Sequence, residues 1–257
     1  EVGVITPVEV SMPRKATTTL SWLSGRDLAR AWKLMDPSRP EQTRDDLIEV
    51  VDALGVDYSR LSGVAAAQWY EQMRSKSGVT KPFTPRPEQP VNRDRIRGTV
   101  KWAAGSLWGS HPEETVATLT QSLDRWVRTG ASATITGNAA ADRACTRYAR
   151  VPQGARTCTF CTMLASRGWV YASKASAGGL TRYHPGCDCA IVPSFGKRGS
   201  TPQLQGYDPD AYLALYEQGR ARAGSGSETD ILAAMRRVNP DQYTDCLLYT
   251  SDAADDL

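Results

Sequence analysis

The segment Cys158-Thr-Phe-Cys161 is followed, after 22 further residues, by His184-Pro-Gly-Cys187-Asp-Cys189. Four of the six cysteines and one of the two histidines lie in these two segments, a concentration that chance scatter does not explain. Thiolate and imidazole are the ligands that zinc prefers, and a Cys-x-x-Cys turn directs two sulfurs toward one point. The pattern predicts a small module that folds around one structural zinc ion. Its candidate ligands are Cys158, Cys161, His184, Cys187 and Cys189.

The candidate ligands outnumber the positions of a tetrahedral zinc site, which takes four. A site closed by four soft ligands leaves no position for water, and this is typical of a structural rather than a catalytic zinc. Cys187 and Cys189 would point the same way from a strand, so one of them is expected to lie outside the coordination sphere. The sequence leaves open which four of the five residues bind.

Three other interpretations of the cluster stay open. Cys158 and Cys161 could form disulfides with Cys187 and Cys189, if the protein works outside a reducing cytoplasm. A redox Cys-x-x-Cys pair would explain the first segment but not the second. A Cys–His hydrolase would use Cys161 or Cys158 with His184 as its base, yet no orienting third residue is evident from the sequence.

The composition limits the class of protein. Hydrophobic residues make up 40% and charged residues 23% of the 257 residues, as in an ordinary globular protein. The apolar runs are shorter than a membrane span, so no membrane partner is expected. The net charge of +3 is too small to require a nucleic-acid partner. A nucleic-acid-binding zinc module remains an alternative, and it would use the basic clusters at 93–97, 197–198 and 236–237.

The first part of the chain predicts an arm and then helices. Residues 1–40 are expected to form an N-terminal arm, rich in Pro, Thr and Val over 1–20, and one short helix that ends before Pro37. Residues 41–150 are expected to form a helical domain because apolar side chains recur at helical spacing. Within it, Gly55 is predicted to end the helix that begins near residue 41, and the last helix is predicted over 131–149. Cys145 on that last helix is interpreted as a small buried hydrophobic residue.

The character of the sequence changes after Pro152. Residues 151–196 are expected to form the metal-binding module, with helical turns after Cys158 and strands over 168–171 and 190–192. Residues 197–245 predict a helical segment whose helices open at Asp208-Pro209 and at Ser227. The predicted fold class is therefore mainly helical α+β, with a helical domain followed by a small zinc-stabilised module.

We interpret the last twelve residues as foreign to the natural protein. The segment 246–257, beginning Cys-Leu-Leu-Tyr-Thr-Ser, resembles a translated sequencing adapter. We interpret it as read-through and exclude it from the expected fold. Its removal would leave five cysteines, four of them in the cluster.

Two segments carry a resemblance to a known family. Val151-Pro-Gln-Gly-Ala-Arg-Thr-Cys158-Thr-Phe-Cys161, continuing to Gly168, and Tyr183-His-Pro-Gly-Cys-Asp-Cys-Ala-Ile-Val-Pro193 resemble the phage Mu F-like head morphogenesis family. The similarity is greatest to minor capsid proteins of tailed phages that infect actinobacteria, and it extends over roughly residues 20–240. The family's Cys-x-x-Cys and His-x-x-Cys-x-Cys positions fall on the five candidate zinc ligands.

The resemblance implies a structural role. It implies a minor capsid protein of few copies that lies near the portal inside the phage head and acts in head morphogenesis. The implied partners are phage portal and capsid or scaffold proteins, the packaged DNA, and further copies of the chain. The implied location is the virion, with the host cytoplasm during assembly. No catalytic residues are carried over, so no enzymatic activity is expected.

Overall fold

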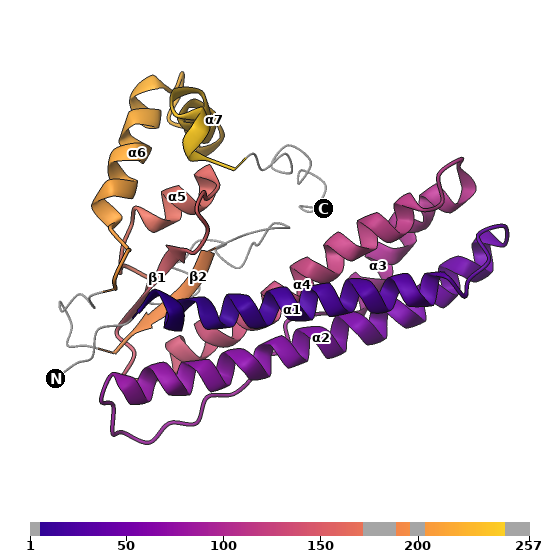
Figure 1. Cartoon of the computed structure of the whole chain (residues 1–257), viewed down its shortest axis with the longest axis horizontal. Helices are drawn as coiled ribbons and strands as arrows, with labels where there is room; N and C mark the ends of the chain where they lie inside the picture. Colours follow the sequence, from indigo (N-terminus) through magenta and orange to yellow (C-terminus); the bar gives the residue numbers. More distant parts are fainter. Residues whose placement is uncertain (1–5, 172–188, 196–203, 245–257) are drawn as a thin grey trace.

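The computed structural model describes residues 6–171, 189–195 and 204–244. Within these ranges it contains seven α-helices, two short 3₁₀ helices and one antiparallel sheet of two strands. Long helices form an elongated bundle, and a smaller lobe with the sheet stands at one end of it (Figure 1). The predicted class, mainly helical with a small β component, is confirmed. No helix in the described part is long and apolar enough to cross a membrane.

Three helices run along the bundle: α1 (Pro7–Trp32), α2 (Pro40–Lys76) and α4 (Glu114–Ala141). The shorter α3 (Arg93–Ala103) and the 3₁₀ helix η1 (Ala104–Trp108) complete the end that lies far from the lobe. We call this the distal end of the bundle.

The predicted N-terminal arm is wrong from residue 7 onward, because α1 is one continuous helix. The backbone N–H of Thr6 donates to Glu9 Oε2 at 2.9 Å, which satisfies a helix-start donor in the manner of a capping box. Val10 is fully buried, and the indole Nε1 of Trp69 donates to Glu9 O at 2.7 Å. Contacts with α2 therefore hold a segment whose local composition is poor in helix-forming residues.

The predicted helix end at Gly55 is also wrong, because α2 continues to Lys76. Gly55 is buried, and a Cβ atom there would lie 3.0 Å from Trp126 Cε3 and 3.1 Å from Ile96 Cδ1. The glycine thus makes room for neighbouring side chains in the middle of the helix rather than ending it.

The helix predicted over 131–149 is wrong after residue 141. Residues up to Ala141 belong to α4, and strand β1 begins at Arg147. The carboxylate Oδ1 of Asp142, the residue after α4, accepts from Ala144 N at 2.9 Å and so favours a turn. Cys145 therefore lies in a turn between a helix and a strand, and not on a helix.

The bundle contains two hydrophobic cores. The distal core includes Leu28, Leu47, Val51, Ile96, Val100, Leu119, Leu123 and Trp126. The junction core combines bundle residues with residues of the lobe and includes Val10, Trp69, Tyr70, Met73, Ala131, Ile135, Tyr148, Cys161, Leu164, Ile191 and Met235. The junction core thus draws on side chains from both sides of residue 150, where the helical domain was expected to end.

Between the two cores, α2 and α4 approach each other through small residues. A Cβ atom on Gly130 would lie 2.3 Å from Ser59 O and 2.7 Å from Ser59 Oγ. In α2, Ser59 falls between the distal-core residue Val51 and the junction-core residue Ala66. We call this close approach of the two helices at Gly130 and Ser59 the waist of the bundle.

The lobe is built on strands β1 (Arg147–Pro152) and β2 (Cys189–Ser194), which pair antiparallel with Pro152 opposite Cys189. Every residue of β2 is buried, which confirms the strand expected over 190–192. The strand expected over 168–171 is reduced to a single bridge between Tyr171 and Tyr148. Their rings stack with centroids 5.5 Å apart.

Helix α5 (Thr159–Ala165) packs on β1, and helices α6 (Pro209–Arg222) and α7 (Glu228–Val238) pack on α5 and on each other, away from the bundle (Figure 1). The predicted starts of α6 and α7 are confirmed. Asp208 accepts from Asp210 N and Ala211 N, and Ser227 accepts from Asp230 N. The expected tail over 246–257 lies outside the described residues.

Candidate metal site in the junction core

Three of the five predicted zinc ligands lie in the described part of the chain, and all three are buried. Cys158 is the N-cap residue of α5, Cys161 lies in the first turn of that helix, and Cys189 opens β2. Their exposed fractions are 3%, 0% and 8%. His184 and Cys187 lie outside the described residues.

The fold brings the cysteines of α5 next to the cysteine of β2. The sulfur atoms of Cys161 and Cys189 lie 3.1 Å apart, although 28 positions separate the residues in sequence. The backbone N–H of Cys161 donates to Cys158 Sγ at 3.3 Å, and this contact closes the Cys-x-x-Cys turn. The predicted convergence of the two segments is therefore present for these three residues.

The distances limit the chemistry of the described sulfurs. At 3.1 Å, Cys161 and Cys189 are not joined by a disulfide bond, whose sulfurs lie about 2.05 Å apart. Within the described ranges, no group of three or more Cys, His, Asp or Glu side chains is arranged as a metal site. The donor chemistry suits zinc, and a complete set of four ligands requires at least one residue beyond the described ranges.

A buried arginine also belongs to this cluster. Arg150 on β1 is fully buried, and its Nε and Nη2 atoms lie 3.2 Å and 2.5 Å from Cys189 Sγ. The strand register explains the contact, because Arg150 opposes Ile191 and is thus a diagonal neighbour of Cys189 on one face of the sheet. The sequence analysis missed Arg150, since nothing near it in the chain indicates a cysteine partner.

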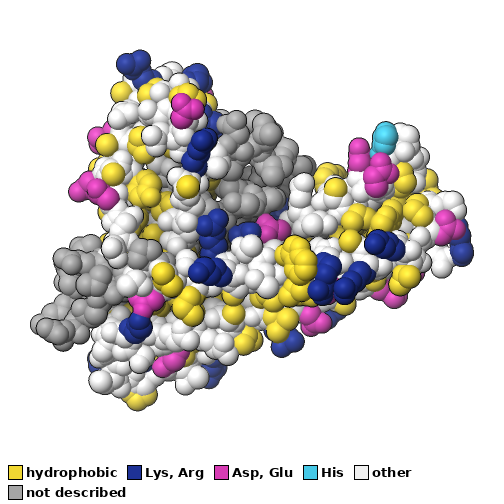
Figure 2. Space-filling view, in the orientation of Figure 1, with side chains coloured by type: hydrophobic (Ala, Val, Ile, Leu, Met, Phe, Trp, Pro, Cys, Tyr) yellow, Lys and Arg dark blue, Asp and Glu magenta, His cyan; other side chains and the backbone are white. Residues whose placement is uncertain are grey.

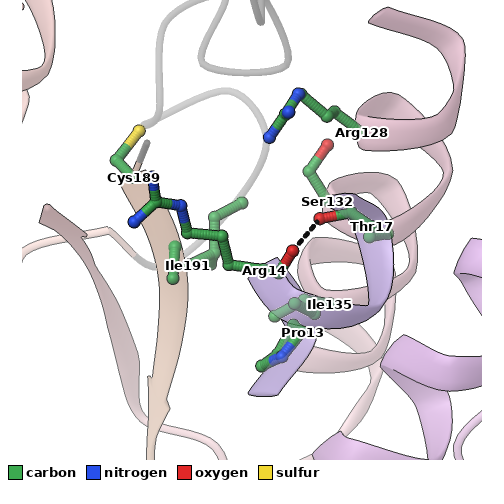
Figure 3. A pocket seen from close by; sticks show the side chains of 10 residues that line it. Pro13, Arg14, Thr17, Arg128, Ser132, Ile135, Cys189 and Ile191 are labelled. Carbon is green, nitrogen blue, oxygen red and sulfur yellow. Dashed lines mark hydrogen bonds between the residues drawn. The ribbon is translucent and has the colours of Figure 1, made fainter. Parts of the chain in front are cut away.

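A small hollow lies beside the cluster, between α1, α4 and β2. Its volume is about 40 Å³, which is room for water rather than for a substrate. Figure 3 shows Cys189 on β2 at one side of the hollow, with Arg14 of α1 and Arg128 of α4 projecting toward it. Arg128 is paired with Asp124 at 2.9 Å.

The comparisons with known proteins cover the bundle and most of the lobe. The family model of the VG15 protein matches residues 5–219, which include the bundle and the whole cysteine cluster. The chain belongs to the VG15 protein family. A relative in this comparison is the "Gene 15 protein" of Mycobacterium phage D29, which is 28% identical over 202 residues. That alignment covers 59% of this chain and 73% of the phage protein. No solved structure matches the chain.

Membership of the VG15 family and the mycobacteriophage relative confirm the expectation of a phage protein family. They do not reach the narrower Mu F-like assignment, nor a role in the capsid or at the portal.

The basic clusters of this VG15-family chain are partly engaged in internal contacts. Arg93 forms an ion pair with Asp52, and Arg236 Nη1 donates to Thr159 Oγ1 at 3.0 Å. Lys197 and Arg198 lie outside the described residues. These contacts are typical of residues that support the fold.

Cys145 is separate from the cluster. It is half-buried against the junction core, and its Sγ donates to Arg147 O at 3.4 Å. Burial raises the pKa of the Cys145 thiol to about 11, so the thiol stays protonated at neutral pH. This agrees with its interpretation as a packing residue rather than a nucleophile.

Proposed function

We propose that this VG15-family chain is a structural minor capsid protein of a tailed phage, of the Mu F-like kind, that acts in head morphogenesis near the portal. The observation that carries the proposal is the burial of the described cysteines inside the core that joins bundle and lobe. The phage relative supports the phage setting, and the two motif segments support the Mu F-like assignment.

The burial of the cysteines favours a stabilising role over catalysis. A nucleophilic cysteine must be reached by its substrate and paired with a base. Cys158 and Cys161 are at most 3% exposed, and the hollow beside Cys189 holds only about 40 Å³. We therefore propose that the chain has no hydrolase activity.

One structural zinc ion is part of the proposal. Cys158, Cys161 and Cys189 would hold it together with a ligand from His184 or Cys187, as their spacing predicts. When bound, zinc supplies folding free energy by tying its ligands to one another. Here the ligands come from α5 and β2, and β2 packs against the bundle. The metal would therefore fix the lobe to the bundle.

The outer surface of the bundle offers contacts for other head proteins. Three tryptophans are exposed there: Trp22 by 64%, Trp102 by 74% and Trp108 by 52%. Figure 2 shows hydrophobic side chains gathered along the distal half of the bundle, with Lys and Arg side chains beside them. Aromatic and arginine residues are enriched in protein interfaces. We propose portal, capsid or scaffold proteins as the partners of this surface.

The phage itself provides the test of the role. A phage that encodes this chain is grown with and without the gene, and its particles are purified. We expect mass spectrometry to find the chain in DNA-filled heads at a few copies, and electron microscopy to show fewer complete heads without the gene. Normal heads without the gene, together with absence of the chain from particles, would overturn the proposal.

The zinc is tested on the purified chain. We expect elemental analysis to give about one zinc per chain, and Cys158→Ser to lose it. The matched control is Cys145→Ser, which should keep its zinc because Cys145 lies outside the cluster. A well-folded chain that carries no metal, with cross-linked cysteines, would establish the disulfide interpretation instead.

A further inference from the structure

We propose that residues of α2 and α4 form a binding site for an extended, proline-rich peptide segment, and that residues 79–91 of the chain itself occupy this site. We call residues 79–91 the connector, because they join α2 to α3. Figure 1 shows the connector leaving the end of α2 and returning along the bundle. None of the residues that form the site is a candidate zinc ligand, so the site depends neither on zinc nor on the proposed capsid role.

Asn138 of α4 binds the connector through the connector's backbone. Its Oδ1 accepts from Arg86 N at 2.9 Å, and its Nδ2 donates to Arg86 O at 2.8 Å. Nδ2 also donates to Thr134 O at 2.7 Å, one turn earlier in α4, and this bond fixes the direction of the amide. The Asn138 side chain is only 5% exposed, and a buried amide needs such partners. The pair of bonds to Arg86 resembles the main-chain pairing by which a sheet edge binds an extended peptide.

Small side chains beside this amide allow the connector backbone to come close. Thr134 Oγ1 accepts from Glu88 N at 2.9 Å, two residues after Arg86. A Cβ atom on Gly63 of α2 would lie 3.1 Å from Glu88 O, and a Cβ atom on Gly137 of α4 would lie 2.7 Å from Glu88 Oε1. Larger residues at these two glycines would therefore push the connector away from the helices.

The contacts define the chemistry of the segment that fits. They use backbone atoms at two alternate positions, which lie along one edge of an extended chain. The connector's four prolines favour this extended conformation and remove backbone N–H groups that would need other partners. Phe83 adds an apolar anchor, because its ring centroid lies 6.2 Å from that of Tyr70 and 5.5 Å from Arg74 Cζ. The matching ligand is an extended proline-rich segment with an aromatic residue at one end.

The connector is an occupant that a partner can displace. Within residues 81–90, Phe83 and Pro85 are half-buried and the others are exposed. The short tether to α2 keeps the connector at a high effective concentration, so a few contacts are enough to hold it. A segment of the same chemistry from another protein would compete for the same amide and hydroxyl groups. The partner class is therefore a protein with an extended proline-rich segment.

The test uses the full chain with its connector replaced by a Gly/Ser linker of equal length, which leaves the site open. The probe is a fluorescent synthetic peptide of residues 79–91, and anisotropy measures its binding after circular dichroism has shown that the variant is folded. We expect saturable binding, and we expect Asn138→Ala in this variant to weaken it by about 10-fold because two hydrogen bonds are lost.

Two altered peptides separate backbone recognition from non-specific binding. A methyl group on the backbone nitrogen of Arg86 removes the donor to Asn138 and should weaken binding by about 10-fold. The matched control is the peptide with Arg86→Ala, which keeps every backbone contact and should bind like the original. Equal binding of the N-methylated peptide, or of a scrambled peptide, would overturn the proposal. A folded variant that binds no peptide would overturn it as well.

Hydrogen exchange in the wild type decides the question if the linker variant does not fold. A large molar excess of the peptide should speed exchange of the Arg86 and Glu88 amides, because the connector leaves its partners Asn138 and Thr134. The N-methylated peptide should have a much smaller effect. Unchanged exchange at both amides would overturn the displacement. All these readouts are independent of bound metal and of particle assembly, so their failure leaves the proposed function standing.

Discussion

Arg74 and Asp142 form a buried ion pair that fastens the end of α2 to the end of α4. Arg74 Nε lies 2.7 Å from Asp142 Oδ2, and the side chains are only 4% and 3% exposed. The guanidinium also donates to Lys81 O, and the Tyr70 hydroxyl lies 3.4 Å from the same carboxylate oxygen. A pair of this kind costs desolvation to form, but removal of one partner leaves an unbalanced charge in the core.

We expect Arg74→Ala to lower the free energy of unfolding by about 3 to 5 kcal/mol, because Asp142 loses its buried partner. The control is Arg60→Ala, since Arg60 lies 3.9 Å from Asp57 and both side chains are more than half exposed. That change should cost less than about 1 kcal/mol. Urea unfolding of both variants measures the difference, and equal losses would contradict the special role of the buried pair.

Cys145 gives the protein a dependence on alkaline pH. Burial raises the pKa of its thiol from an ordinary value of 9.0 to about 11. The stabilisation linked to the neutral thiol is complete below pH 9 and is lost as the pH rises through 11. We expect the wild type to lose about 2 kcal/mol more than Cys145→Ala between these limits. The two proteins share their buried tyrosines, so parallel urea-unfolding curves across this range would contradict the prediction.

Among the elements, those with local signals were predictable from the sequence and those fixed by distant contacts were not. Asp208 and Ser227 mark the starts of α6 and α7 through their own side chains, so pattern reasoning found them. The start of α1 does carry a local signal, the Thr6–Glu9 capping box, which the sequence analysis missed. The contact of Trp69 Nε1 with Glu9 O joins α2 to α1, and no local pattern contains it. Glycine is common at helix ends, which is why the sequence predicted an end at Gly55. In the structure Gly55 lies inside α2, where the absent side chain leaves room for Trp126 and Ile96.

The waist is the part of α2 and α4 that is most sensitive to an added atom. We expect Gly130→Ala to destabilise the fold by about 3 kcal/mol, because its Cβ would lie 2.3 Å from Ser59 O and the helices would have to separate. The control is Gly98→Ala on the exposed face of α3, where no atom lies within 4 Å of an added Cβ. That change should stabilise by up to about 1 kcal/mol through helix propensity. Thermal melting of both variants compares them, and a neutral Gly130→Ala would show that the waist can widen.

At the scale of the whole molecule, the two cores divide the bundle into parts that need not open together. The described buried residues of the distal core come from α1, α2, α3, η1 and α4, whereas those of the junction core include residues of the lobe. Local opening follows the contacts that hold each region. A perturbation of the cysteine cluster is therefore expected to reach the near half of the bundle but not its distal end.

Removal of zinc by a strong chelator should expose this division. We expect faster hydrogen exchange in α5, β1, β2 and the end of α4 that contains Ile135, because they share the junction core with the cluster. Amides around Ile96 and Leu119 in the distal core should keep their protection. Mass spectrometry of peptides resolves these regions. A uniform loss of protection along the bundle would contradict the division, and so would a chelator effect that Cys158→Ser does not reproduce.

The proximity of the three described cysteines was predictable from the sequence, but their surroundings were not. The spacing of Cys158, Cys161 and Cys189 was enough to name them as candidate ligands, because a Cys-x-x-Cys turn is formed by neighbouring residues. Arg150 enters through the pairing of β1 with β2, which joins residues 39 positions apart in the chain. The residues around Arg150 in the sequence form no pattern that predicts its contact with Cys189.

The waist also rules out competing arrangements of the same helices. Two helices whose apolar stripes repeat every turn could in principle pair after sliding by one turn. Such a slip would bring Trp126 or Thr134 of α4 opposite Ser59, at a place where not even a Cβ is accommodated on Gly130. The small residues contribute little buried apolar area of their own. Their contribution is to the specificity of the fold, because they favour a single register in which α2 and α4 can pack against each other.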